Sequence, residues 1–217
     1  MKHKIHSRRG ASMLLGLLFL FFAMSIGAIV LTAATANAGR IARVRTAEQS
    51  YLAVQSAAVL LRDDLQTLRF AGAYTETYPY STDENGESTI HGPSYALTAA
   101  SVSNTTFTTL LQSDFESLYR YQTGYFGVSS YTPTMHTATV RLDDTFPAVT
   151  ATLSLADDYT LTAMLQSADG GAYPMVLRFT PQIRQSQSTE SSDEADVTTY
   201  TTTVTLLPGI ITKGGAT

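Results

Sequence analysis

A long segment near the start of the chain is uncharged and mostly apolar. The segment from Ala11 to Ala38 has 28 residues and no charged side chain. At 1.5 Å per residue, a helix of this length measures roughly 42 Å, which exceeds the ~30 Å hydrocarbon core of a bilayer. A helix in the core of a soluble domain would be shorter and would carry a polar face. We therefore expect a membrane-inserted helix here.

After this segment the apolar positions take the spacing of an amphipathic helix. Eight apolar residues recur at intervals of three or four, which places them in one stripe along a helix. They are Val44, Ala47, Tyr51, Val54, Ala58, Leu61, Leu65 and Leu68. No proline occurs between Met1 and Tyr78, and Gly72 stands where a helix stop is expected. The pattern predicts one nearly continuous helix from about Ala11 to Phe70, whose stripe packs on another layer.

The pattern of residues 71–217, combined with the long helix, predicts an α+β fold. Apolar residues between Thr105 and Tyr121 follow a helical spacing. Five later segments alternate apolar and polar residues as half-buried strands do, namely 137–142, 148–155, 159–165, 173–180 and 197–207. Consecutive short strands favour an antiparallel β-meander, whose apolar face the helix stripe can cover. Residues 74–93 and the acidic segment 185–196 are expected to be loops.

The charge is distributed unevenly along the chain. The 217 residues include 14 Lys and Arg against 18 Asp and Glu, a net charge of −4. Residues 1–10 carry four basic side chains and no acid, whereas from residue 46 onward there are 7 basic and 18 acidic side chains, a net of −11. An acidic body argues against a nucleic-acid partner. Because cysteine is absent, disulfides, thiolate-bound zinc and a thiol nucleophile are excluded.

The sequence contains no motif typical of catalysis or metal binding. The histidines have no ligand pattern around them, and they are His3, His6, His91 and His136. Acidic pairs such as Asp143-Asp144 lack the spacing of a calcium loop. We expect no enzymatic activity, no metal and no cofactor. Four tyrosines lie close together in sequence, Tyr119, Tyr121, Tyr125 and Tyr131, and they suit either an adhesive surface or burial under the sheet.

A short basic leader ending in Arg8-Arg9-Gly10 directly precedes the apolar segment. This arrangement resembles the leader of type IV prepilins. The resemblance implies that a membrane prepilin peptidase cuts after Gly10, so that Ala11 becomes the first residue and the helix is kept as an assembly stalk. Residues 45–58 resemble the stretch after the membrane helix in tip-associated minor pilins, so the resemblance covers about residues 5–65.

The charge distribution and the apolar pattern divide the chain into four predicted parts. They are a basic leader (1–10), the transmembrane half of the helix (11–38), its amphipathic half (39–70) and an extracytoplasmic β-rich domain (71–217). The chain would cross the cytoplasmic membrane once, with its N-terminus inside. Its implied partners are membrane lipid, the prepilin peptidase and other pilin-like subunits.

One position departs from the family pattern. Major pilins have Glu as the fifth mature residue, and here that position is Leu15. In the family this Glu binds the N-terminal amine of a neighbouring subunit, since a lone carboxylate in a bilayer needs a partner. The departure implies an initiating or tip-located subunit of a type IV filament or a type II secretion-like apparatus.

Two other hypotheses remain open. Ala36-Asn37-Ala38 fits the cleavage site of a secretory signal peptide, although the strongly apolar stretch of 19 residues exceeds the usual length of about 7–15. Alternatively, Gly10 has no role and the helix is an unprocessed anchor. Either hypothesis describes a membrane-anchored or Sec-secreted surface protein with a β-rich binding or adhesion domain.

Overall fold

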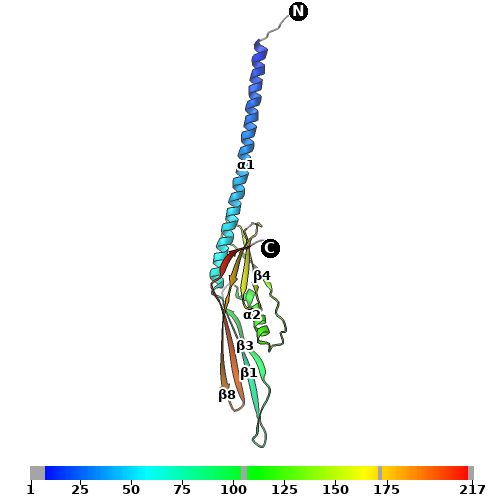
Figure 1. Ribbon diagram of the computed structural model, residues 1–217, viewed down its shortest axis with the longest axis vertical. Coiled ribbons are helices and arrows are strands. Elements are labelled where there is room, and N and C mark those ends of the chain that lie inside the picture. The colour runs from blue at the N-terminus through cyan, green and yellow to red at the C-terminus, as the bar shows by residue number, and fades with distance from the viewer. Residues whose placement is uncertain (1–7, 104–106, 171–172, 215–217) are drawn as a thin grey trace, which may run out of the picture. The chain divides into compact units, whose positions relative to one another are not determined.

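The computed structural model describes residues 8–103, 107–170 and 173–214 (Figure 1), with the backbone alone for residues 8–12 and 108. The described residues form two helices and ten strands, and all strand pairs are antiparallel. The chain divides into two compact units, residues 1–48 and 49–217, and helix α1 (Arg8–Leu65) contributes to both. The predicted α+β class, with a long N-terminal helix packed on antiparallel strands, is confirmed.

Residues 13–49 of α1 are exposed on all sides. Large apolar side chains dominate this part, and Leu14, Phe19 and Phe22 are 70%, 65% and 60% exposed. Its hydroxyl groups bond to the preceding helical turn, as Ser25 does to the Phe21 carbonyl at 2.8 Å, so they need no water. By length and composition the helix can cross a membrane.

Helix α1 ends at Leu65, five residues earlier than the predicted Phe70. The Thr67 hydroxyl and amide both donate to the Asp64 carbonyl, at 2.7 and 3.1 Å, and close the last turn. Phe70 already belongs to strand β1 (Arg69–Thr82), where it lies opposite Val204. The helical period continued in the sequence, but pairing with a distant strand decides the conformation after Leu68.

From Ser50 onward, one side of α1 is buried in the core of the second unit. Of the predicted stripe, Tyr51 is half-buried, and four helical residues and one turn residue are buried: Val54, Ala58, Leu61, Leu65 and Leu68. The expectation that Val44 and Ala47 pack on the β-rich part is wrong, because both precede Gln49, where that unit begins, and both are exposed. Ala53 and Ala57, which the stripe omitted, are fully buried.

The predicted meander corresponds to one of two five-stranded sheets. This sheet has the order β10-β7-β6-β5-β4. Its strands are β4 (Met135–Val140), β5 (Val149–Leu155), β6 (Leu161–Ser167), β7 (Met175–Phe179) and β10 (Ile210–Lys213). The first four match the first four predicted strands, and alternate side chains of β5 are buried, as the sequence pattern requires. Strand β10 was not predicted.

The second sheet differs from the prediction. Its order is β2-β1-β9-β8, and β3 also pairs with β1. Besides β1, its strands are β2 (Ser88–Ile90), β3 (Ser94–Ser103), β8 (Pro181–Ser191) and β9 (Ala195–Leu206). Strand β9, predicted as the last strand of the meander, pairs with β1 and β8 instead. The loops expected at 74–93 and 185–196 are largely strands, because their backbones pair with neighbouring strands although none of their side chains is buried.

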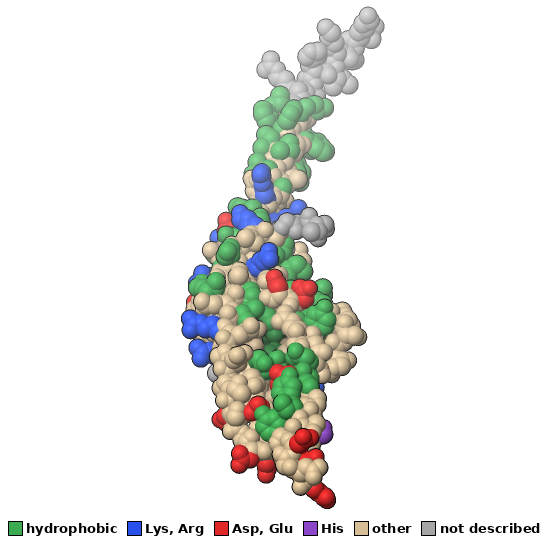
Figure 2. All heavy atoms as spheres, turned by 60° about the horizontal axis from the view of Figure 1, so that its bottom comes forward, with side chains coloured by type: hydrophobic (Ala, Val, Ile, Leu, Met, Phe, Trp, Pro, Cys, Tyr) green, Lys and Arg blue, Asp and Glu red, His purple; other side chains and the backbone are tan. Residues whose placement is uncertain are grey.

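The turns of the β1–β2 and β8–β9 hairpins lie side by side. The Tyr80 amide, at the end of β1, donates to the Glu194 carbonyl at 2.8 Å. Both turns are rich in acids, with Asp83, Glu84 and Glu87 in one and Asp193 and Glu194 in the other. Figure 2 shows acidic side chains gathered at the bottom of that view.

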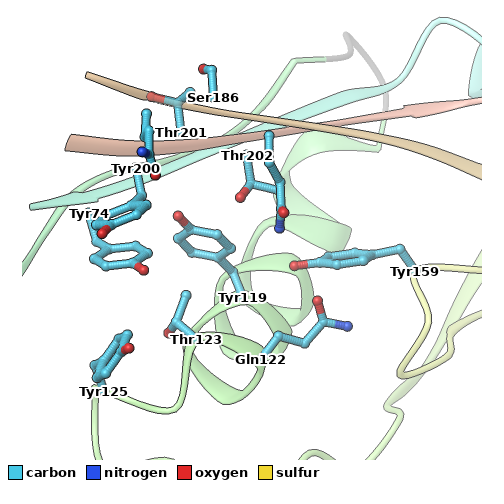
Figure 3. A pocket seen from close by; sticks show the side chains of 12 residues that line it. Tyr74, Tyr119, Gln122, Thr123, Tyr125, Tyr159, Ser186, Tyr200, Thr201 and Thr202 are labelled. Atoms are coloured by element: carbon cyan, nitrogen blue, oxygen red, sulfur yellow. The ribbon is translucent and has the colours of Figure 1, made fainter. Parts of the chain in front are cut away.

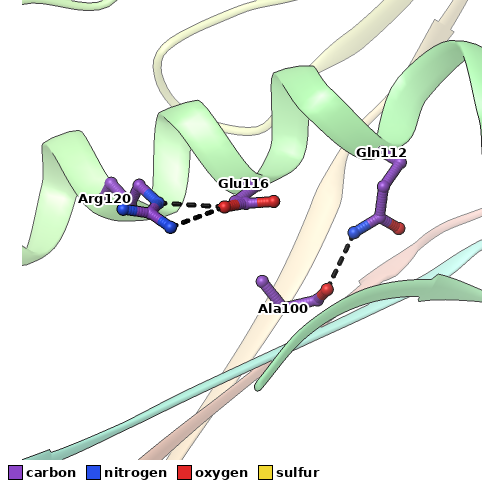
Figure 4. Close-up of polar contacts among 4 residues, drawn as sticks. All are labelled: Ala100, Gln112, Glu116 and Arg120. Atoms are coloured by element: carbon purple, nitrogen blue, oxygen red, sulfur yellow. Dashed lines mark hydrogen bonds and ion pairs between the residues drawn. The ribbon is translucent and has the colours of Figure 1, made fainter. Parts of the chain in front are cut away.

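Helix α2 (Thr108–Thr123) covers β3 and the start of β1, close to the predicted range 105–121. The Gln112 side chain accepts from the Val102 amide at 2.8 Å and donates to the Ala100 carbonyl at 2.7 Å. Figure 4 shows the second of these bonds, together with the Glu116–Arg120 ion pair on the same helix. Gln112 thus satisfies backbone groups at the edge of β3 and fixes α2 on this sheet.

Candidate binding site

The pairing register gathers tyrosines on one face of the β1–β9–β8 sheet. Tyr74 of β1 lies opposite Tyr200 of β9, which in turn lies opposite Gln187 of β8. Directly opposed residues point to the same face, and so do residues two positions apart on one strand. Glu76 and Tyr78 therefore share this face with Tyr74, and Tyr95 of β3 lies opposite Glu76.

Glu76 stands at the centre of this face and accepts three hydrogen bonds from tyrosine hydroxyls. Tyr78 and Tyr95 donate to Oε1 at 2.9 and 3.0 Å, and Tyr200 donates to Oε2 at 3.1 Å. The bond from Tyr78, followed by those from Tyr95 and Tyr200, lowers the pKa of the Glu76 carboxyl. Burial and the Glu76 carboxylate raise the pKa of Tyr95 to about 12.

Ring stacking extends this network beyond the sheet. Tyr125, from the loop after α2, stacks on Tyr95 with ring centroids 3.9 Å apart and planes 6° from parallel. Tyr74 and Tyr200 stack at 4.9 Å and 15°. We call these five rings and the carboxylate they surround the tyrosine face, which consists of Tyr74, Tyr78, Tyr95, Tyr125, Tyr200 and Glu76. Aromatic pairs in these geometries contribute about 0.5–1.5 kcal/mol each beyond area burial, so stacking stabilises the arrangement of the face.

A cavity of about 550 Å³ adjoins the tyrosine face, and we call it the tyrosine cavity. One wall consists of β1, β8 and β9, with Tyr74, Gln187 and Tyr200 among its residues. The C-terminal end of α2 and the turn before β6 supply Tyr119 and Tyr159 (Figure 3). Every lining side chain is Tyr, Gln, Thr or Ser. The cavity therefore combines flat rings with uncharged hydrogen-bonding groups.

The hydroxyls of Tyr119 and Tyr159 point into this cavity, as Figure 3 shows. Their side chains are only 2% and 1% exposed. Neither hydroxyl has a partner with hydrogen-bonding geometry among the residues that the structure describes. Burial raises the pKa of both tyrosines, and the nearby Thr202 side chain offsets part of that rise for Tyr119. A buried unsatisfied polar group costs about 1–3 kcal/mol, so these two hydroxyls call for an explanation that the described residues do not supply.

Local structure explains how Tyr159 reaches the cavity. It follows Asp157-Asp158 in the tight turn between β5 and β6 and has a positive φ of 64°. The Asp158 carboxylate accepts from the Thr160 amide at 2.8 Å and holds this turn. The Gln122 side chain, near the end of α2, donates to the Asp157 carbonyl and ties the helix to the same turn.

Of the four tyrosines that the sequence grouped together, only Tyr119 and Tyr125 belong to the site. The Tyr131 hydroxyl donates to the Leu155 carbonyl at 3.0 Å, and Tyr121 is not a lining residue. The remaining site tyrosines were missed. The signal was available for β1, because Tyr74, Glu76, Tyr78 and Tyr80 alternate with period two, as a strand face requires.

The other candidate residues lie outside this site. Gly10 and Ala11 fall in the backbone of α1, their side chains are outside the described residues, and so are residues 1–7 of the leader. Leu15 is 58% exposed on the apolar part of α1. His91 bonds with the Ser81 hydroxyl and His136 with the Asp114 carboxylate. Within the described ranges, no three His, Asp or Glu side chains are placed to share a metal ion.

The tyrosine cavity thus has an arrangement suited to binding, with two buried hydroxyls directed into it and stacked rings beside it. The fold presents a long apolar N-terminal helix followed by antiparallel sheets, an architecture consistent with that of pilin-like proteins. No family model, curated protein or solved structure matches this chain.

Proposed function

We propose that this chain is a pilin-like minor subunit of a type IV filament or a type II secretion-like apparatus. The observation that carries the proposal is the division within one uninterrupted helix. Residues 13–49 of α1 are exposed and largely apolar, whereas one side of residues 50–65 is buried in a β-rich core. Such a helix can hold a subunit in a membrane and also serve as an assembly stalk that continues into its folded domain.

The leader and the position of Leu15 specify the proposal further. The basic leader ending in Gly10 supports removal by a prepilin peptidase, which leaves Ala11 as the first residue. With Leu15 at the fifth mature position, the subunit lacks the carboxylate that contacts a subunit ahead of it. Its own N-terminal amine remains available to the subunit behind, and this suits an initiating or tip position.

A second function is favoured by the tyrosine cavity. A membrane-anchored or Sec-secreted surface protein with a β-rich binding domain would use such a cavity for a ligand, whether or not it assembles into a filament. The buried hydroxyls of Tyr119 and Tyr159 are the observation that favours this alternative.

N-terminal sequencing of the mature protein, produced in cells with a prepilin peptidase, distinguishes the hypotheses. A start at Ala11 supports the pilin-like subunit, a start at Gly39 supports secretion, and an intact Met1 supports an unprocessed anchor. Gly10→Leu should leave the leader attached, since such peptidases tolerate little else at that site. Gly16→Ala is the matched control, because a Cβ at position 16 meets no atom within 4 Å. A mature mass unchanged by Gly10→Leu would refute the pilin-like hypothesis.

A further inference from the structure

The uncharged lining of the tyrosine cavity restricts the charge of a ligand that can bind there. Its lining side chains are tyrosines, amides and aliphatic hydroxyls. A charged ligand would leave water there without an opposite charge to pair with, which is unfavourable. Glu76, the carboxylate of the tyrosine face, is not a lining residue, and both of its oxygens already accept tyrosine hydroxyls. The cavity therefore favours an uncharged ligand.

The shape and the polar groups restrict the ligand further. The cavity volume of about 550 Å³ lies within the usual range of about 300–1,000 Å³ for small-molecule sites. The stacked rings of Tyr74 and Tyr200 stand at one wall, and the amides of Gln185 and Gln187 stand on the neighbouring strand. Each amide offers both donors and an acceptor. A suitable ligand thus needs an apolar face for the rings and several hydroxyls for the amides.

We infer that the tyrosine cavity is a binding site for a neutral saccharide. The C–H face of a pyranose ring packs on a tyrosine ring, and its hydroxyls bond with the Gln185 and Gln187 amides. The hydroxyls of Tyr119 and Tyr159, buried and aimed into the cavity, gain in the sugar the partners that the protein does not supply. This inference does not depend on whether the chain assembles into a filament.

Saturation-transfer NMR tests the inference on the full chain in lipid nanodiscs, because many detergents carry sugar headgroups. The probes are four neutral trisaccharides: maltotriose, mannotriose, galactotriose and triacetylchitotriose. Two charged trimers serve for comparison. Trigalacturonate is the acidic counterpart of galactotriose, and deacetylated chitotriose is the basic counterpart of triacetylchitotriose. We expect saturation of ring protons in at least one neutral trisaccharide. We also expect both charged trimers to bind at least fivefold more weakly than the neutral trisaccharide that binds best.

Two conservative variants locate the binding. Tyr119→Phe and Tyr159→Phe remove only hydroxyls that lack a partner among the described residues, so each should keep or raise the Tm. Each should raise the Kd for the bound trisaccharide at least fivefold. Tyr131→Phe is the matched control, because its hydroxyl bonds with the Leu155 carbonyl outside the cavity. It should lower the Tm and leave the Kd unchanged.

Several results would overturn the inference. They are the absence of binding by all four neutral trisaccharides, an unchanged Kd in both cavity variants, and tighter binding of a charged trimer. A fall in Tm for both Phe variants would also overturn it, because it would show that the two hydroxyls have structural partners.

Discussion

The ring of Tyr119 lies directly on the backbone of Gly72. A Cβ at position 72 would come within 2.8 Å of ring carbons Cε1 and Cζ, closer than real contacts allow. Gly72 lies opposite Thr202 in the sheet, in the row next to Tyr74 and Tyr200. The missing side chain therefore lets α2 bring Tyr119 flat onto β1, with its hydroxyl directed into the tyrosine cavity.

Gly72→Ala should destabilise the protein by about 1–3 kcal/mol, because neither the strand nor the buried ring can move freely. Urea unfolding of the full chain in nanodiscs, followed by tyrosine fluorescence, measures the change. Gly92→Ala is the control, since a Cβ there meets nothing within 4 Å. In the double variant Gly72→Ala/Tyr119→Leu the two costs should be less than additive. Additive costs would mean that the contact does not exist in solution.

Glu76→Gln should lower stability by about 1–2 kcal/mol at pH 7, because charge-assisted bonds from tyrosine hydroxyls are lost. The pKa of the Glu76 carboxyl is lowered below its usual value of 4.5, so its contribution is fully present above that pH. The contribution disappears as the pH falls through the lowered pKa. The difference in unfolding free energy between the two proteins should therefore vanish in acid. A difference that stays constant between pH 7 and pH 3 would contradict this origin.

The sequence predicted those elements in which the spacing of apolar residues matches the side chains that are buried. In β5, alternate side chains are buried, and Val149, Ala151 and Leu153 show this directly. Strand β8 has no such apolar spacing, because nearly all its side chains are exposed and its backbone is held by pairing with β9. Its polar residues therefore indicated a loop.

The tyrosine face was not predicted for a related reason. Its bond from Tyr200 to Glu76 joins residues 124 positions apart, and Tyr95 and Tyr125 come from two further segments. The local pattern of β1 could have shown that Tyr74, Glu76 and Tyr78 share a face. It could not have shown which distant strand lies opposite, since that depends on the register of β9.

Leu61→Asp should lower stability by several kcal/mol, because it buries a carboxylate in the core. The Leu61 side chain is 3% exposed, whereas its neighbour Leu60 is 55% exposed on the same helix. Leu60→Asp is thus a closely matched control and should change stability by less than about 0.5 kcal/mol. Limited proteolysis of the full chain in nanodiscs compares how sensitive the two variants are to cleavage, which rises as stability falls. Equal sensitivity of the two variants would show that α1 does not pack through Leu61.

The last prediction concerns Leu15 and rests on the proposed filament function. A subunit without a carboxylate at this position should add poorly beneath an existing subunit, so it should be rare relative to the major subunit. Its loss should reduce the number of filaments more than their length. Leu15→Glu should allow incorporation along the shaft.

Position in the filament can be observed by a single label. The chain has no cysteine, so Asp193→Cys, in the exposed turn between β8 and β9, provides one thiol for a gold or fluorescent tag. The label should appear at filament tips when residue 15 is Leu and also along shafts when it is Glu. An unpaired Glu in a bilayer is costly, so the amount of each variant in the membrane must be matched before filaments are compared. Labelling along the shaft with Leu15 in place would refute the tip position, even if the processing at Gly10 is found.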